Sequence, residues 1–196
     1  MFHPIPERIR KRMSELEKID ERDRLDGTPQ AERLRQIPPV TGRFLALLAA
    51  SVPPGKMIEI GTSAGYSTLW LALAAKQTGH PFTTVELFEN KVQMAAETFR
   101  LADIEDIVNL VQADARDYLA GEGDIALCFL DTEKELYQPC YDLAVPRLVR
   151  GGLLLADNVI SHADDLADFI QHAADDPRVD AVVVPIGKGL LMARKS

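Results

Sequence analysis

The chain alternates short apolar runs with longer segments in which apolar residues recur at helical spacing. From Lys56 onward, the apolar runs predict strands near residues 56–60, 81–86, 107–112, 124–130, 151–156, 180–185 and 188–194. The segments between them predict helices at about 65–76, 89–102, 136–148 and 162–173. Strands that alternate with helices are typical of an α/β fold on a mostly parallel sheet.

Only a turn around Gly187 separates the last two predicted strands. We expect them to pair as an antiparallel hairpin, because so short a connection cannot lead to a parallel neighbour. The predicted fold is a doubly wound, mostly parallel seven-stranded sheet that ends in this hairpin and is preceded by helices.

The first fifty residues differ from the rest. Residues from about Pro6 to Arg24 are highly charged with sparse apolar positions, which predicts an amphipathic helix lying on the domain or on a second subunit. A turn at residues 26–29 follows, and Pro38-Pro39 precede a strongly apolar helix, Val40 to Ala50. We therefore expect an N-terminal helical extension, residues 1–37, and a main domain, residues 38–196.

Composition limits the partners. No apolar run reaches the roughly 18 to 20 residues that span a bilayer, and Met1 to Lys11 lacks the apolar stretch of a secretion signal, so we expect a cytoplasmic protein without a membrane partner. A formal net charge of −8 disfavours nucleic acid as the main partner, because phosphate binding draws on clustered Lys and Arg. Cys128 and Cys140, without metal-site spacing, are expected to be free and buried.

The segment Met57 to Ser67 runs from a predicted strand through a glycine-containing turn into a helix. Gly61 and Gly65 allow a ligand to approach the backbone, and the helix N-terminus offers N–H groups to an anion. Ser63 replaces the second glycine of the dinucleotide fingerprint, so a pyrophosphate is not expected. The turn indicates a different nucleotide ligand, although a plain tight turn would also explain it.

Acidic residues strengthen the nucleotide interpretation. Glu59 precedes the glycine turn, Glu86 closes the next strand and Asp114 closes the third. Carboxyl ends of parallel strands are where such sheets bind ligands, and a carboxylate at the second strand end can accept hydrogen bonds from ribose hydroxyls.

A second set of polar residues follows strands four and five. Asp131 ends one strand, and Asp157-Asn158 end the next. Because neighbouring parallel strands end at the same edge, these side chains should converge, and three oxygen ligands suit a hard cation such as Mg²⁺. The alternative is that Asp157 and Asn158 only cap a helix or form a turn.

These motifs resemble those of class I S-adenosylmethionine-dependent methyltransferases, although Ser63 and Ala113 stand where glycine is common. The segment Leu-Leu-Leu-Ala-Asp-Asn-Val at 153–159 resembles the metal-dependent O-methyltransferases, the family of catechol and caffeoyl-coenzyme A O-methyltransferases. The resemblance covers roughly Pro38 to the C-terminus. It implies S-adenosylmethionine as cofactor, a divalent cation, a small phenolic substrate such as a catechol and, from the family's bacterial members, a homodimer.

The resemblance also implies residue roles. Cofactor contacts fall on Glu59, Gly61, Thr62, Ser63, Gly65, Ser67, Glu86, Asp114, Ala115 and Asp131. The methionine part would lie against Glu59 and the glycine turn, with its carboxylate near Ser67. Glu86 would bind the ribose, and Asp114 with Ala115 the adenine.

The metal ligands implied by the resemblance are Asp131, Asp157 and Asn158, and Lys134 matches the proposed general base. A cation that chelates two adjacent hydroxyls would lower a phenol's pKa, so that Lys134 could accept its proton. The alternative for Lys134 is an exposed lysine between two glutamates.

Two other functions fit the same sequence features. One is a metal-independent methyltransferase of the same fold that acts on another acceptor, and the other is a non-catalytic nucleotide-binding protein. An NAD-dependent oxidoreductase is disfavoured, because the dinucleotide glycine pattern is missing.

Overall fold

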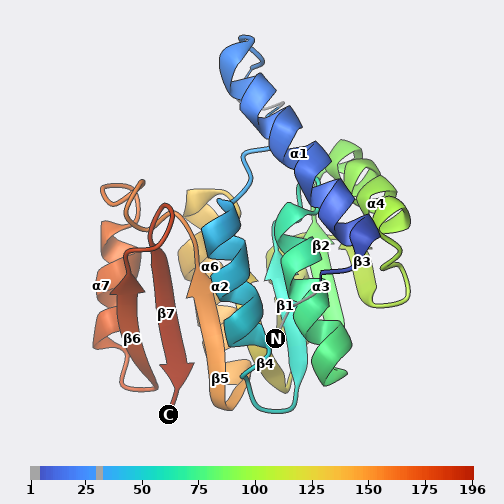
Figure 1. The fold of residues 1–196 in the computed structure, drawn as a ribbon. Helices are drawn as coiled ribbons and strands as arrows, with labels where there is room; N and C mark the ends of the chain where they lie inside the picture. The colour runs from blue at the N-terminus through green and yellow to red at the C-terminus, as the bar shows by residue number, and fades with distance from the viewer. Residues whose placement is uncertain (1–4, 30–32) are drawn as a thin grey trace.

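In residues 5–29 and 33–196, which the computed structural model describes, seven strands form one sheet in the order β3-β2-β1-β4-β5-β7-β6 (Figure 1). The strands are β1 (Lys56–Ile60), β2 (Phe82–Glu86), β3 (Val108–Gln112), β4 (Ile125–Leu130), β5 (Leu148–Ala156), β6 (Val179–Val184) and β7 (Leu190–Lys195). β1 to β5 run parallel, and β7 lies antiparallel between β5 and β6. The predicted mostly parallel sheet and C-terminal hairpin are confirmed.

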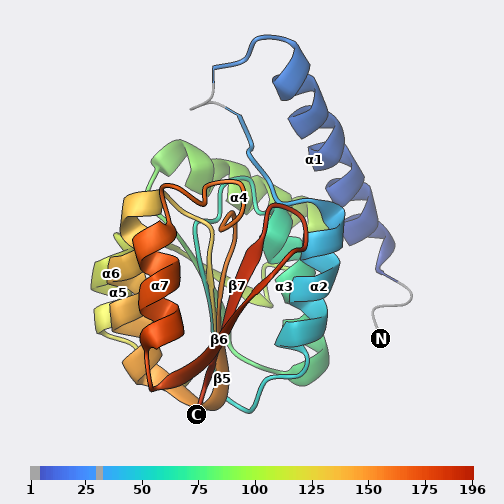
Figure 2. The ribbon, with the colours of Figure 1, turned by 90° about the vertical axis from the view of Figure 1, so that its left-hand side faces the viewer.

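Helices cover both faces of the sheet (Figures 1 and 2). They are α1 (Glu7–Leu25), α2 (Pro39–Ala49), α3 (Tyr66–Thr78), α4 (Glu89–Ala102), α5 (Ala115–Ala120), α6 (Tyr137–Ala144) and α7 (Ala167–Asp175), with the 3-10 turns η1 (Lys134–Leu136) and η2 (Val145–Arg147) on either side of α6. α2, α3 and α4 pack on one face, and α5, α6 and α7 on the other. No helix in the described ranges is long and apolar enough to cross a membrane.

Helix α1 lies outside the first helical layer, against α3 and α4 (Figure 1). Its buried side chains Ile9, Met13 and Leu16 belong to the same hydrophobic core as α3. Arg12 donates hydrogen bonds of 3.1 and 3.0 Å to Thr98 Oγ1 on α4. The predicted amphipathic helix is thus present and packs on its own chain, while the division into residues 1–37 and 38–196 stays a prediction.

The strand register aligns the carboxyl ends of four strands. Ile60 of β1 pairs with Val85 of β2 and with Leu130 of β4, and Leu130 pairs with Ala156 of β5. The next residue on each strand therefore leaves the sheet at the same level. Those residues are Gly61, Glu86, Asp131 and Asp157.

Two elements differ from the sequence pattern. Helix α5 is not predicted, because six residues are too few to show a helical period; its sequence signal is Asp114, which caps it by accepting a hydrogen bond from Arg116 N at 2.8 Å. The helix predicted from residue 162 begins later, at Ala167. Ile160 N and Ser161 N both donate to Lys188 O, which ties this stretch to the β6–β7 turn before α7 can begin. Cys128 and Cys140 are free and buried, as predicted.

Candidate active site

A cleft of about 820 Å³ lies along the carboxyl ends of β1 to β5. This volume is in the range of small-molecule sites. The sheet side of the cleft includes Gly61, Thr62, Ser63, Ser67, Glu86, Asp114, Ala115, Asp131, Lys134 and Asn158, and the opposite wall includes Asp20, Arg24 and residues 33–37. The structure therefore brings most of the predicted cofactor and metal residues to one cavity.

The glycine turn is shaped by close backbone packing. Gly61 has φ +93°, and a Cβ there would lie 2.1 Å from the carbonyl oxygen of Asp131, so that only glycine fits. Gly65 has φ +85°, and a Cβ there would lie 2.8 Å from the Phe99 ring, so this glycine serves the packing of α3 on α4. Ser63 adopts φ +48° and donates from Oγ to Leu34 O at 3.0 Å.

Glu86 joins the glycine turn to the start of α4. One of its oxygens accepts a hydrogen bond from Ser63 N at 2.9 Å, and the other accepts from Leu87 N and Phe88 N at 2.9 and 3.1 Å. The side chain is nearly buried but lines the cleft. Glu86 is therefore held in one orientation at the second strand end, where the sequence predicts a ribose contact.

Glu59 lies away from the cleft. It is fully buried within β1 and does not line the cavity, and its Oε2 accepts hydrogen bonds from Thr68 Oγ1 and, at 2.7 Å, from Thr84 Oγ1. Burial raises the pKa of the Glu59 carboxyl to about 7. Glu59 thus joins β1 to β2 and α3 beneath the turn, while its Oε1 is buried without a partner in the described residues. Its contact with the cofactor stays a prediction.

The remaining predicted cofactor residues lie on either side of this centre. Thr62 is nearly buried, with its Oγ1 2.6 Å from Thr84 Oγ1, and Ser67 stands in the first turn of α3. At the β3 end, Asp114 holds an ion pair with Arg116, 2.6 Å from Nη2 to Oδ2, and these hydrogen bonds lower the pKa of the Asp114 carboxyl to about 2. Ala115 follows it as the first residue of α5.

Asp131 and Asn158 line one corner of the cleft, whereas Asp157, the residue before Asn158, is fully buried and is not part of the lining. Asn158 Nδ2 donates to Asp131 Oδ1 at 2.8 Å, while both carboxylate oxygens of Asp157 are buried without a hydrogen-bond partner in the described residues. Burial raises the pKa of the Asp157 carboxyl to about 7, with a contribution from Asp131, whose own carboxyl pKa burial also raises. Asp157 therefore does not cap a helix through its side chain, and its role as a metal ligand stays a prediction.

A divalent cation fits the chemistry of this corner. Two unpartnered oxygens on a buried carboxylate are costly, and a cation would satisfy them. Within the described ranges no three His, Cys, Asp or Glu side chains gather at one point, so the available donors are the Asp131 and Asp157 carboxylates and the Asn158 amide.

Lys134 stands beside this corner at the start of η1. Its ammonium donates to Thr132 O at 3.0 Å and to Tyr137 Oη at 2.9 Å, and Tyr137 Oη donates in turn to Asp157 O at 3.1 Å. Burial lowers the pKa of the Lys134 ammonium, against the opposing effect of Asp131. Lys134 is therefore not the exposed lysine of the alternative interpretation.

Several residues of the site are not apparent from the sequence. Tyr137 is fully buried and links Lys134 to β5, and Arg35, Lys91 and Lys188 line the cleft. Lys91 Nζ donates to Arg33 O at 3.2 Å, which fixes the segment at residues 33–37. The sequence gives no signal for these cations, because they lie on segments that come together only in the fold.

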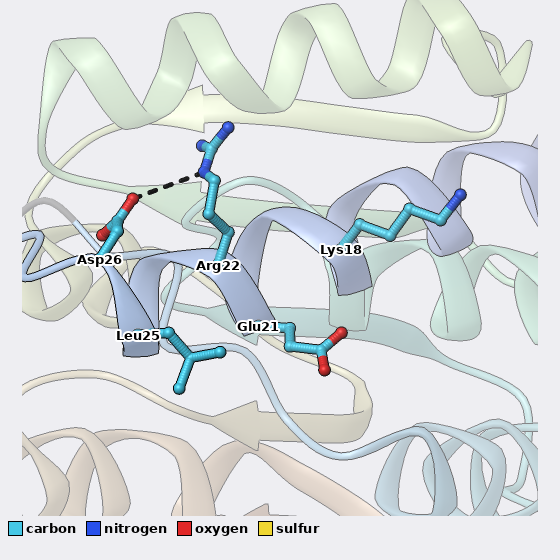
Figure 3. Close-up of a pocket in the computed structure, with 5 residues that line it drawn as sticks. All are labelled: Lys18, Glu21, Arg22, Leu25 and Asp26. Carbon is cyan, nitrogen blue, oxygen red and sulfur yellow. Dashed lines mark ion pairs between the residues drawn. The ribbon is translucent and has the colours of Figure 1, made fainter.

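A second, shallower hollow lies on the outer part of α1, among Lys18, Glu21, Arg22, Leu25 and Asp26 (Figure 3). Arg22 and Asp26 form an ion pair of 3.6 Å there. These side chains come from one stretch of helix, and none of the predicted site residues is among them.

The strand order, the glycine turn after β1 and the cleft along the sheet edge define a class I methyltransferase fold. The chain belongs to the O-methyltransferase family, within the S-adenosylmethionine-dependent enzymes, because the O-methyltransferase family model matches residues 13–196.

The chain is similar to a catechol O-methyltransferase of Mycobacterium tuberculosis, with 35% identity over 130 residues that cover 65% of this chain and 58% of that protein. It is 27% identical to a flavonoid 3′,5′-methyltransferase of Vitis vinifera over 187 residues, 83% of this chain and 79% of that protein. Among solved structures, a methyltransferase of Podospora anserina in its SAH-bound form superposes with a TM-score of 0.79 at 22% identity, covering 99% of this chain and 90% of that one.

Proposed function

We propose that this protein transfers a methyl group from S-adenosylmethionine to one hydroxyl of a small catechol-like phenol that is held with a divalent cation in the cleft. The observation that carries the proposal is the pair of buried Asp157 oxygens without a hydrogen-bond partner in the described residues. Asp157 precedes Asn158, which donates to Asp131, and Tyr137 joins Asp157 O to Lys134. The similarity to catechol and flavonoid methyltransferases supports a phenolic acceptor.

The cofactor would lie along the ends of β1, β2 and β3. Glu86 is oriented by three backbone N–H groups and offers its remaining lone pairs to ribose hydroxyls. The turn from Gly61 to Gly65, with Thr62 and Ser63, and the first turn of α3 at Ser67 would hold the methionine part. Asp114 and Ala115 would border the adenine.

Asp131, Asp157 and Asn158 would hold the cation, with Mg²⁺ most suited to such hard oxygen donors. When bound, the cation would lower the pKa of a chelated phenol and fix the position of its two hydroxyls. The Asn158 amide already orients Asp131 for this role through its 2.8 Å hydrogen bond.

Lys134 would accept the phenol proton as a neutral amine, which its burial favours by lowering the pKa of the ammonium. The bonds to Thr132 O and Tyr137 Oη hold the Nζ atom at one point. The phenolate oxygen then forms a bond to the methyl carbon as the carbon–sulfur bond breaks, which leaves a methyl ether and S-adenosylhomocysteine.

We also propose that the protein forms a homodimer and is located in the cytoplasm. The exposed apolar side chains Val40 and Leu47 on α2 are available for a second subunit. Size-exclusion chromatography with light scattering would give the mass in solution.

The test is methyl transfer from labelled S-adenosylmethionine to catechol and caffeoyl compounds, with Mg²⁺ and then with EDTA. We expect turnover that EDTA abolishes, and Asp157→Ala should abolish turnover while S-adenosylmethionine still binds. EDTA-resistant turnover would instead support the metal-independent methyltransferase, and cofactor binding without turnover of any phenol would support the non-catalytic protein.

A further inference from the structure

Lys188 stands at the acceptor end of the cleft on the turn between β6 and β7. Its carbonyl oxygen accepts hydrogen bonds from Ile160 N and Ser161 N, both at 3.0 Å. The neighbouring Gly189 O accepts from Val159 N at 3.1 Å. The main chain of Lys188 is therefore bound to the segment that directly follows Asp157 and Asn158.

The glycines on both sides of Lys188 allow this close approach. A Cβ on Gly187 would lie 2.1 Å from Thr41 Oγ1, and a Cβ on Gly189 would lie 2.4 Å from the Ile160 side chain. Both glycines have positive φ angles, +57° and +91°. The turn thus packs closely between α2 and the loop after β5. This packing fixes the main chain of Lys188 at the edge of the cleft.

The ammonium of Lys188 has no ion pair or hydrogen bond with any residue in the described ranges, although the side chain is only partly exposed. Lys188 lines the same cleft as Asp131 and Asn158, and its charge lowers the pKa values of the Asp131 and Asp157 carboxyls. A cation that lines a cleft without a partner in the described residues is suited to an anionic ligand group.

Arg35 supplies a second cation from the opposite wall. Among residues 5–29 and 33–196, its guanidinium forms one ion pair, 3.3 Å from Nη2 to Glu133 Oε1, and its other N–H donors have no partner. Glu133 is the residue before Lys134, and Arg35 and Lys188 line the same cleft, so both cations lie near Lys134. Two cations from segments far apart in the sequence therefore border the acceptor end of the cleft.

We propose that Lys188, assisted by Arg35, binds a carboxylate on the acceptor, so that the preferred substrate is a catechol-like phenol that carries a carboxylate on its ring or on a short side chain. This inference rests on the proposed function and names the acceptor class within it. An acceptor without charge gives the Lys188 ammonium no partner, and an acceptor with an amine is repelled by both cations.

A purely structural role for Lys188 gives a different expectation. If Lys188 only balances the charges of Asp131 and Asp157, its removal should weaken Mg²⁺ binding and lower the turnover of all acceptors equally. If Lys188 binds the acceptor carboxylate, its removal should affect acidic acceptors alone.

The experiment compares 3,4-dihydroxybenzoate, catechol and dopamine as acceptors for the wild type, Lys188→Met, Arg35→Met and a control, Lys76→Met, which makes the same charge change on α3 outside the cleft. For the wild type we expect kcat/KM to fall in that order. Lys188→Met should lower kcat/KM for 3,4-dihydroxybenzoate about tenfold or more, mainly through KM, and change catechol less than about threefold. Arg35→Met should also lower kcat/KM for 3,4-dihydroxybenzoate more than for catechol, but by a smaller factor than Lys188→Met.

Binding to the protein loaded with S-adenosylhomocysteine and Mg²⁺ separates the two proposals. Calorimetry should give a dissociation constant for 3,4-dihydroxybenzoate about tenfold below that for catechol, and Lys188→Met should remove this difference. Equal binding of the two compounds, or an equal loss for both in Lys188→Met, would overturn the carboxylate site even if catechols are methylated. Preferential binding without methylation would keep the carboxylate site and refute the proposed reaction.

Discussion

Gly61 and Asp131 are packed backbone against backbone, with 2.1 Å between the place of a Gly61 Cβ and the Asp131 carbonyl oxygen. This contact joins the ends of β1 and β4 and so joins the cofactor turn to the metal corner. We expect Gly61→Ala to lower the free energy of unfolding by about 3 kcal/mol or more, from backbone displacement added to the strain of a positive φ.

Urea unfolding and cofactor titration would measure this change. The matched control is Gly79→Ala, because Gly79 has φ +74° but no atom within 4 Å of its Cβ position, so it reports the strain alone, about 1–2 kcal/mol. Equal losses in the two variants would show that the contact with Asp131 has no role.

Glu86→Gln should weaken S-adenosylmethionine binding about tenfold or more. The amide can still accept from Leu87 N and Phe88 N, but its Nε2 would then face the N–H of Ser63, donor against donor. Calorimetry measures the dissociation constant, with Glu89→Gln as the control, because Glu89 is exposed at the start of α4. An unchanged constant in Glu86→Gln would remove Glu86 from the cofactor site.

Lys134→Met should lower kcat about 100-fold or more while cofactor binding stays unchanged, because the proton acceptor is lost. Tyr137→Phe should lower kcat less, about tenfold, since Lys134 loses one of its two hydrogen bonds and Asp157 O loses its donor.

Tyr141→Phe is the control for Tyr137→Phe. Tyr141 is equally buried, but its hydroxyl donates to Asp176, away from the cleft. Single-turnover rates should therefore change for Tyr137→Phe and stay near wild type for Tyr141→Phe. The reverse order would argue against a role of Tyr137 in positioning Lys134.

Leu16→Ala should lower the free energy of unfolding by about 2–4 kcal/mol, because Leu16 is buried between α1 and the core. Leu25→Ala, on the same helix but 81% exposed, should change it by less than about 0.5 kcal/mol. A single cooperative transition in both variants is expected if α1 unfolds with the rest, and a separate early transition would support an independent extension.

Asp176→Asn should lower stability at neutral pH by about 1–3 kcal/mol. Asp176 accepts hydrogen bonds from Arg178 and Tyr141, and the Arg178 contact holds the pKa of the Asp176 carboxyl well below its ordinary value. Because the pKa of this carboxyl is lower in the folded state than its ordinary value of 3.8, the ionised carboxylate stabilises the folded protein at pH values above 3.8. This stabilisation is lost progressively as the pH falls below 3.8.

Urea unfolding at pH 7 and at pH 3 would show the effect. The difference in unfolding free energy between the wild type and Asp176→Asn should be largest at pH 7 and smaller at pH 3. Asp175→Asn, whose carboxylate is exposed and accepts from Gln171, serves as the neighbouring control. A pH-independent difference would point to packing instead of charge.

The strands were predictable because β4 is a run of buried apolar residues and β1 is one apart from Lys56 and Glu59. The predicted ends of both strands match the structure within a residue. The sequence also predicts which residues meet at the edge of the sheet, since parallel strands in register end at one edge. In the structure these strand ends carry Gly61, Glu86, Asp131 and Asp157. Position at a strand end is a property of the sequence pattern alone.

Other features depended on tertiary placement. Glu59 lies two residues before Gly61 and is therefore still inside β1, where its Oε2 accepts hydrogen bonds from Thr68 and Thr84. Arg35 and Lys188 reach the cleft only because the segment at 33–37 and the β6–β7 turn fold over it. No local sequence pattern indicates that Arg35 and Lys188 both line the cleft.

The position of β7 has a consequence for synthesis of the chain. β7 lies between β5 and β6, so the outer edge of β5 has no neighbour until residues 190–195 have left the ribosome. Domains emerge N-terminus first, and an unpaired strand edge is prone to aggregate. A polypeptide interrupted after Val184 would therefore carry the glycine turn, Lys134 and Asp157, yet present β5 as an open edge, which would make nascent chains stalled at this stage substrates for chaperones or proteases.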